Sequence, residues 1–355
     1  MLHYILKRLL LMIPTLLGVL LVSFVVIQFV PGGPVKQMVY QLKGRGAAEA
    51  AGNTSVGSSS SYQAARGLSE EQLSQIKAQY GFDQPAPVRF WQMLKNYATF
   101  NLGDSWFRHA SVTQLIWDKL PVSMSLGISS LLLTYLIAVP LGVAKALRHG
   151  SRFDAVTTVM LMVGYAIPSF VLGVVLLVLF GGGSFWAVFP LRGLTSDDFA
   201  TMSWSAQVMD FFWHLALPVT ALVVAGFASL TMLTKNSFLE EIHQQYVTTA
   251  RAKGLTERRI FWRHILRNAA LPLVVGLPGA IIGAFFTGSL LIETLFSLDG
   301  LGLLAYESVI RRDYPVVLGT LYFFTLLGLL GRLLSDIAYV VVDPRVQFGA
   351  VGAST

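Results

Sequence analysis

The reactive side chains of this 355-residue chain form none of the familiar catalytic patterns. The sequence has no G-x-x-x-x-G-K-[ST] phosphate loop, no H-E-x-x-H zinc motif and no G-x-S-x-G nucleophile elbow. The six histidines are scattered, and His243 lies one helical turn from a possible second ligand, Glu240, on a segment where solvation is the plainer explanation. The chain has no cysteine, which excludes disulfides and thiolate chemistry. We therefore expect no enzymatic activity, no metal site and no cofactor bound by this chain.

Two charged residues, Arg332 and Asp336, stand inside an apolar stretch. They are four residues apart, so on one helix they face the same side and can form an intramembrane ion pair. Charges within a membrane span usually face the bundle interior or a wet path, which suggests a polar lining or a gate. The alternative is a clamp between helices. We favour the clamp, because an internally neutralised pair makes a poor ligand.

The segment 234–271 concentrates basic residues. Its apolar residues are spaced as on one face of a helix up to Ala250, Gly254 breaks this helix, and Thr256 can start a second, basic amphipathic helix. Residues 237–240 fit a capping box, which predicts a helix start there. Such a unit suits docking to a cytoplasmic protein, lying on anionic lipid, or setting membrane topology. Its seven bases are Lys235, Arg251, Lys253, Arg258, Arg259, Arg263 and Arg267.

The composition predicts the elements that carry these residues. Hydrophobic residues make up 54% of the chain and charged residues 13%, whereas an ordinary soluble domain has about 25% charged residues. A bilayer core needs about 20 mostly apolar residues per helix. Six segments qualify, which predicts an all-α polytopic membrane protein with six transmembrane helices. They are Leu9–Val30, Val122–Val143, Ala155–Phe180, Phe211–Leu233, Pro272–Ile292 and Val316–Val342.

The basic residues also predict the orientation and exclude nucleic acid as a partner. With both termini in the cytoplasm, the inner segments hold 13 bases and 5 acids, whereas the outer segments hold 12 bases and 13 acids. This distribution follows the positive-inside rule. The net charge of +7 is therefore a topology signal. The first span follows Lys7 and Arg8 like a signal peptide, but its length and the lack of a cleavage pattern indicate a retained anchor.

The predicted spans divide the chain into four parts. Residues 1–30 are the cytoplasmic N-terminus and first helix, and residues 31–121 are a long outer loop with a Gly/Ser-rich, low-complexity stretch at 44–67. Residues 122–342 are a five-helix core, and 343–355 are a cytoplasmic tail. After a helix predicted to open at Ser69, the outer loop is rich in aromatic residues between Tyr80 and Leu120. These either anchor at the lipid headgroups or form a small folded cap.

The order of several motifs adds a resemblance. Tyr246–Leu255 followed by His264–Pro272 resembles the cytoplasmic coupling loop of binding-protein-dependent ABC importers, in the version of the dipeptide, oligopeptide and nickel permeases. The wider family has Glu-Ala-Ala where this chain has Thr248, Thr249 and Ala250. Further motifs of that subfamily stand in order at 30–34, 80–85, 101–105, 292–297, 299–302, 312–315 and 343–345. The Gly/Ser-rich insert and residues 189–193 look most like the Yej-type peptide permeases, which are similar to transporters of oligopeptides and microcin C.

This resemblance implies a type I ABC importer permease fold with a periplasmic insert between the first two helices. It implies a multi-pass protein of the bacterial inner membrane that forms half of a pathway for oligopeptides. The partners implied are a second, homologous permease, a cytoplasmic ATPase that holds ATP and Mg²⁺, a periplasmic peptide-binding protein, lipid and the peptide itself. Residues 237–271 would couple to the ATPase. The coupling residues implied are Tyr246, Thr249, Ala250, Arg251, Lys253, Gly254, Leu255, Arg258, Arg263, His264 and Arg267.

The residues leave other functions open. A permease for dipeptides or nickel chelates shares the same motifs, and the spacing assigns no substrate contact. A self-sufficient secondary transporter needs ionisable residues near the membrane midplane, and only Arg332 and Asp336 come close. A membrane-embedded enzyme needs a catalytic group of residues that the sequence lacks. Whether the two ATPase domains form one chain also lies outside this sequence.

Overall fold

The computed structural model describes residues 2–29, 83–182, 185–285 and 290–342, and these are predominantly helical with no strands beyond two isolated bridges. The predictions for the Gly/Ser-rich stretch, the helix opening at Ser69 and the tail at 343–355 lie outside these residues. The described chain divides into two compact units. Of the described residues, unit 1 contains 2–10, 116–182, 185–285, 290–306 and 324–342, and unit 2 contains 11–29, 83–115 and 307–323.

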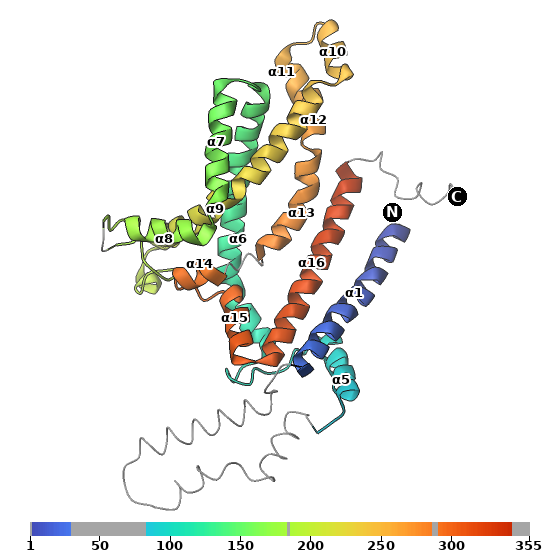
Figure 1. Ribbon diagram of the computed structural model, residues 1–355, viewed down its shortest axis with the longest axis vertical. Coiled ribbons are helices and arrows are strands. Elements are labelled where there is room, and N and C mark those ends of the chain that lie inside the picture. Colours follow the sequence, from blue (N-terminus) through green and yellow to red (C-terminus); the bar gives the residue numbers. More distant parts are fainter. Residues whose placement is uncertain (1, 30–82, 183–184, 286–289, 343–355) are drawn as a thin grey trace, which may run out of the picture. The chain divides into compact units, whose positions relative to one another are not determined.

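Long apolar helices supply the membrane spans (Figure 1). Within the described residues, four helices are long and apolar enough to cross a membrane: α1 (Leu2–Phe29), α6 (Val112–Leu147), α9 (Trp204–Ile242) and α16 (Tyr314–Val342). Two bent helix pairs bring the number to six if each pair is one span. One pair is α7 (Arg152–Ala166) with α8 (Ser169–Phe180), and the other is residues 257–269 with α13 (Leu271–Phe285).

The third span differs from the straight helix that its apolar run predicts. It bends by 93° between α7 and α8, and Figure 1 shows α8 lying across the direction of α7. Ile167, which precedes Pro168, has an extended backbone with ψ 117°. The proline ring disfavours helical geometry at the residue before it, so the helix ends and restarts in a new direction. Hydropathy reports the length of this span but not its bend.

The predicted capping box at 237–240 is wrong. Ser237 and Glu240 lie inside α9, which continues for 39 residues from Trp204 to Ile242. Phe238 is fully buried there, and Thr231 and Thr234 bond back to the carbonyls of the preceding turn. Packing of this helix against its neighbours therefore outweighs the local preference of serine for a helix start, as tertiary context often does.

Small residues let the helices of unit 1 approach closely. A Cβ on Gly127 of α6 would lie 1.7 Å from the carbonyl oxygen of Ala284 in α13. A Cβ on Gly142, nearer the C-terminal end of α6, would lie 2.7 Å from the carbonyl oxygen of Thr231 in α9. Close backbone approach of this kind is the usual way in which membrane helices associate. These two glycines therefore fix α6 against α13 and α9.

A buried carboxylate organises the turn before α15 (Leu301–Arg311). Glu293, in α14 (Leu290–Leu295), is fully buried and accepts hydrogen bonds from the Ser123 hydroxyl and from the backbone N–H of Leu303. A Cβ on Gly300 would lie 2.5 Å from the Glu293 carboxyl carbon, so only glycine fits there. Glu293 thus satisfies free N–H groups at the start of α15, where negative charge is favoured.

Unit 2 is a small folded unit built largely on aromatic packing. Its short helix α5 (Ala86–Ala98) carries Tyr97, whose ring lies 5.1 Å from that of Tyr322, and Trp106 lies edge-on to Tyr314. Ser105 donates a hydrogen bond to the buried Asp313 carboxylate. The unit contains a cavity of about 680 Å³ whose polar lining includes Gln28, Arg89, Gln92, Asn96, Asn101 and Asp104. Part of the aromatic stretch is therefore a folded unit.

Candidate docking surface

The glycine predicted to break the basic segment ends α10 (Gln245–Ala252) in a defined way. Gly254 has a φ of +77°, a conformation that side chains rarely adopt. Its N–H donates to the carbonyl of Arg251 at 2.9 Å, and the N–H of Leu255 donates to that of Ala250 at 3.3 Å. These two bonds form a Schellman motif, which satisfies the last carbonyls of the helix. The predicted break at Gly254 is confirmed.

After this turn the chain forms one nearly continuous helix. It begins with α11 (Glu257–Ile260), continues through a π-helical turn at Phe261–Ile265 and ends with α12 (Leu266–Ala269). Thr256 is the N-cap residue, as predicted. The π turn contains one wider loop of backbone, and such turns are frequent at functional sites. Figure 1 shows α10 and α11 beyond the C-terminal end of α9.

A dry cluster holds these helices on the end of α9, and we name it the loop core. Its aromatic centre is Phe238 of α9, which is fully buried and stacks on Phe261 with ring centroids 5.9 Å apart. Burial of such a side chain contributes about 2 kcal/mol or more. We name α10, α11 and α12 the docking helices, and the loop core makes them a packed extension of α9 and not a loose loop. The loop core consists of Ala146, Phe238, Val247, Ala250, Ile260, Ile265 and Ala269.

Six of the seven basic side chains of the segment lie on its exposed face, whereas Lys235 of α9 is buried. Arg251 differs from the other five exposed bases, because its guanidinium pairs with Glu257 at 2.7 Å and the two charges cancel locally. The remaining bases give this face a positive potential suited to an acidic partner surface. We name this face the docking surface. It consists of Thr249, Lys253, Gly254, Arg258, Arg259, Trp262, Arg263 and Arg267, all exposed.

A second polar contact fixes the connection from α9 to α10. The Tyr246 hydroxyl donates a hydrogen bond to the Glu241 carboxylate. Burial and this bond to a negative charge together raise the pKa of Tyr246 to about 12. The hydroxyl therefore stays protonated at physiological pH and keeps the bond. Tyr246, Leu255 and His264 are half-buried, so they support the docking surface more than they line it.

Two of the predicted coupling residues, Ala250 and Arg251, make contacts within this chain. Ala250 is buried in the loop core, so it packs inside this chain and does not offer a close approach to a partner. Arg251 is engaged with Glu257. Arg259 and Trp262, which is 62% exposed, also lie on the docking surface although they were not among the predicted coupling residues. Trp262 lies outside the apolar side that Ile260 and Ile265 predict, so an exposed position agrees with the helical spacing.

The predicted pair of Arg332 with Asp336 is also corrected. The Asp336 carboxylate pairs with the Arg8 guanidinium of α1 at 2.9 Å, and among the described residues it forms no ion pair with Arg332. Both pairing residues belong to unit 1. They line a cavity of about 400 Å³ together with Arg332 and several glycines of α13 and α16. The contact joins two helices, as the clamp interpretation requires, but with a different cation.

Comparison with known proteins identifies the family of this chain. Residues 138–348, which include the docking surface and the loop core, match the protein family described as "Binding-protein-dependent transport system inner membrane component". The chain belongs to this permease family. The predicted all-α, polytopic permease fold is therefore confirmed, and the permease is a multi-pass protein of the inner membrane. Within the described residues, no group of three or more His, Asp or Glu side chains is arranged to hold a metal ion.

Individual relatives match the permease over nearly its whole length. It is 53% identical to the "Peptidoglycan transport system permease protein YejB" of Agrobacterium fabrum, over 97% of this chain and 98% of that protein. It is 49% identical to the "Inner membrane ABC transporter permease protein YejB" of Escherichia coli O157:H7, over 97% and 98%. It is 33% identical to the "Oligopeptide transport system permease protein AppB" of Bacillus subtilis, over 97% and 99%.

Proposed function

We propose that this chain is a transmembrane subunit of an ATP-driven, binding-protein-dependent importer of oligopeptides, with peptide antibiotics such as microcin C among its cargo. Its relatives are named for peptidoglycan and oligopeptide transport, and peptides are the chemistry that these names share. A second, homologous permease supplies the other half of the pathway. A peptide-binding protein delivers the cargo from the periplasm, and both termini lie in the cytoplasm.

The docking surface is the contact with the ATPase. The observation that carries this proposal is the exposed basic face that includes Trp262, held on α9 through the loop core. Tryptophan and arginine are the residues that most often dominate the energy of protein interfaces. ATP and Mg²⁺ bind to the ATPase, and its closure moves the docking surface. The permease helices then switch between inward-open and outward-open states as rigid bodies.

Substitution of Trp262 tests this proposal. We expect Trp262→Ala to reduce co-purification of the ATPase with the permease complex and ATP-driven peptide uptake by about tenfold or more, the loss typical of a dominant interface residue. Trp91→Ala is the matched control, because Trp91 of α5 is similarly exposed, with 69% of its surface accessible, but lies in unit 2. Normal ATPase recovery and normal uptake in the Trp262 variant would refute the docking role.

Reconstitution tests the energy source. Proteoliposomes that contain both permeases and the ATPase, supplied with binding protein and tripeptide, should take up peptide only when ATP is present on the ATPase side. Vesicles that contain this chain alone should show no uptake. Uptake by the chain alone, driven by an ion gradient, would instead make it a secondary transporter. Competition between an oligopeptide and a muropeptide in the same vesicles then ranks the two peptide classes.

A further inference from the structure

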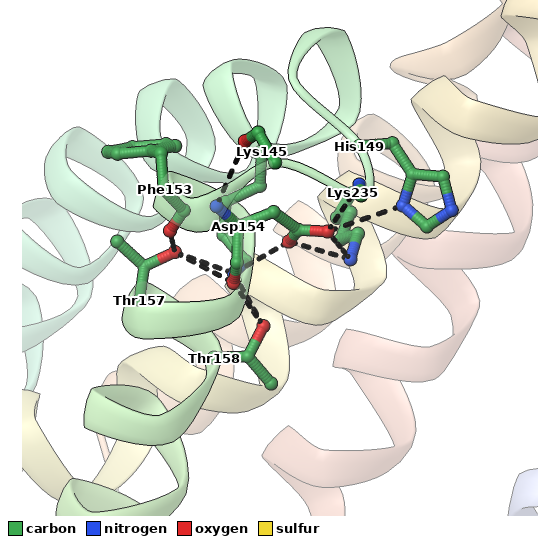
Figure 2. A network of polar contacts seen from close by, with 9 residues as sticks. Lys145, His149, Phe153, Asp154, Thr157, Thr158 and Lys235 are labelled. Atoms are coloured by element: carbon green, nitrogen blue, oxygen red, sulfur yellow. Dashed lines mark hydrogen bonds and ion pairs between the residues drawn. The ribbon is translucent and has the colours of Figure 1, made fainter.

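Three charged side chains meet in the interior of unit 1, where α6, α7 and α9 converge (Figure 2). The ammonium group of Lys235, from α9, donates to both carboxylate oxygens of Asp154 in α7, each at 2.8 Å. The ammonium group of Lys145, from α6, lies 3.0 Å from the same carboxylate. Lys145 is fully buried, and Asp154 and Lys235 are each less than a tenth exposed. We name these three residues the buried charge triad.

The remaining hydrogen-bonding capacity of Lys145 is used within its own hairpin. Its ammonium group donates to the Asp154 carbonyl at 2.8 Å and to the hydroxyls of Thr157 and Thr158 at 2.7 Å. A short turn closes this hairpin, in which Gly150 has a φ of +74° and donates its N–H to the Asp154 carboxylate. The α6–α7 hairpin therefore holds itself together without α9.

Lys235 makes a different kind of connection. It is the member of the triad that comes from α9, so its bidentate bond to Asp154 ties the hairpin to the helix that carries the docking surface. The close contact of Gly142 in α6 with Thr231 and Thr234 in α9 lies within about one helical turn of Lys145 and Lys235. Charged hydrogen bonds in a dry site are strong and directional, and they resist sliding more than apolar packing does.

The triad also adjoins the loop core. Ala146, the residue after Lys145, belongs to the loop core, and Phe238 lies three residues after Lys235 on α9. A force applied to the docking helices thus reaches Lys235 within one turn of α9. A buried carboxylate between two ammonium groups is costly to desolvate, and replacing such a group by apolar residues is often neutral or stabilising. Stability alone therefore gives little reason for two lysines at this site.

We propose that Lys235 and Asp154 form the joint that transmits movement of the docking surface to the α6–α7 hairpin, so that Lys235 is a positioning residue of the transport cycle. This inference rests on the proposed function, because the movement comes from the ATPase. The hairpin and the docking helices move as one body through the joint. Without the Lys235 bond the ATPase still docks, but its closure displaces the docking helices relative to the hairpin and transport is uncoupled from ATP hydrolysis.

A matched pair of substitutions separates this role from a merely structural one. Lys235→Met and Lys145→Met each remove one buried ammonium group and leave Asp154 with a single lysine, so both variants keep a neutral pair. Only Lys235→Met removes the charged bond between the hairpin and α9. We expect Lys235→Met to lower peptide uptake per ATP hydrolysed by roughly tenfold, within the usual range of coupling energies, while ATPase co-purification persists. Lys145→Met should remain coupled.

Distance measurements give a second readout. The chain has no native cysteine, so the exposed positions Arg152 of α7 and Thr248 of α10 can be replaced by cysteine and spin-labelled. In the complete importer, the wild-type and Lys145→Met distances should be the same in nucleotide-free and ATP-trapped states. In Lys235→Met the distance should shift or broaden on ATP trapping.

The proposal is overturned if Lys235→Met stays coupled with an unchanged distance, or if Lys145→Met is uncoupled equally, which would indicate a structural role. If Lys235→Met fails to reach the membrane, Lys235→Leu, which likewise has no donor toward Asp154, replaces it under the same criteria. Failure of the proposed function is a separate result. In that case the wild-type complex shows no ATP-dependent uptake at all.

Discussion

Gly254 offers the sharpest test of the docking surface, because its conformation and its surroundings can be separated. The residue has a φ of +77°, and a Cβ added to it would meet nothing within 4 Å in this chain. A substitution therefore meets two costs of different origin. The first is the left-handed backbone, which costs about 1–2 kcal/mol for alanine and less for asparagine. The second arises only if a partner packs against the glycine.

These costs give a numerical expectation. Gly254→Asn should leave the Schellman turn and the docking surface folded, since asparagine tolerates this backbone and the space around it is open. If the ATPase contacts Gly254 closely, the added side chain overpacks the interface by about 1–3 kcal/mol. This range corresponds to a roughly 5- to 150-fold weaker Kd. Gly254→Ala should show the backbone cost together with a smaller steric cost.

The assay is a titration of the ATPase onto the purified permease complex in detergent, followed by measurement of peptide uptake. Gly103→Asn is the control, because Gly103 has a φ of +82°, would meet only the Pro315 Cβ at 4.0 Å, and lies in unit 2. It should bind the ATPase like wild type. A Kd for Gly254→Asn within about twofold of wild type, less than the smallest overpacking cost, would show that no partner packs against this glycine.

Three further predictions address other parts of the chain. Phe238→Ala should cost about 3–5 kcal/mol locally and speed hydrogen exchange in residues 245–269, and unchanged protection there would refute the loop core. Arg8→Gln breaks the ion pair with Asp336 and should lower the free energy of unfolding by about 0–1 kcal/mol, seen as a slightly lower thermal unfolding temperature. Arg332→Gln should leave that temperature unchanged. Equal effects of the two substitutions would favour the original pairing of Asp336 with Arg332. Burial raises the pKa of Asp313 above its ordinary value of 3.8, so the free energy of unfolding of the wild type should fall as pH rises from about 3.8 through the raised pKa. Asp313→Asn should remove this slope when unfolding is measured across pH. An unchanged slope in the variant would contradict the raised pKa.

The sequence was a good guide wherever a single physical preference decided the outcome. Apolar length predicted the spans, and glycine's freedom at positive φ predicted the break at Gly254. The charge spacing at 234–271 also located the docking surface. Prediction from the sequence failed where two physical preferences competed. The capping preference of Ser237 was outweighed by burial of Phe238, and the pairing of Asp336 with its helical neighbour was displaced by Arg8 from another helix.

The amino-acid sequence by itself determined that the chain is an all-helical membrane protein with one basic, glycine-broken segment, because hydropathy, charge and glycine conformation act over a few neighbouring residues. Only the tertiary structure decided what buries the apolar side of that segment, since Phe238 of α9 and Ala146 of α6 pack against it in the loop core. The tertiary structure alone also brought Lys145, Asp154 and Lys235 together. Asp154 and Lys235 are 81 residues apart, and only the packing of α7 against α9 makes them partners.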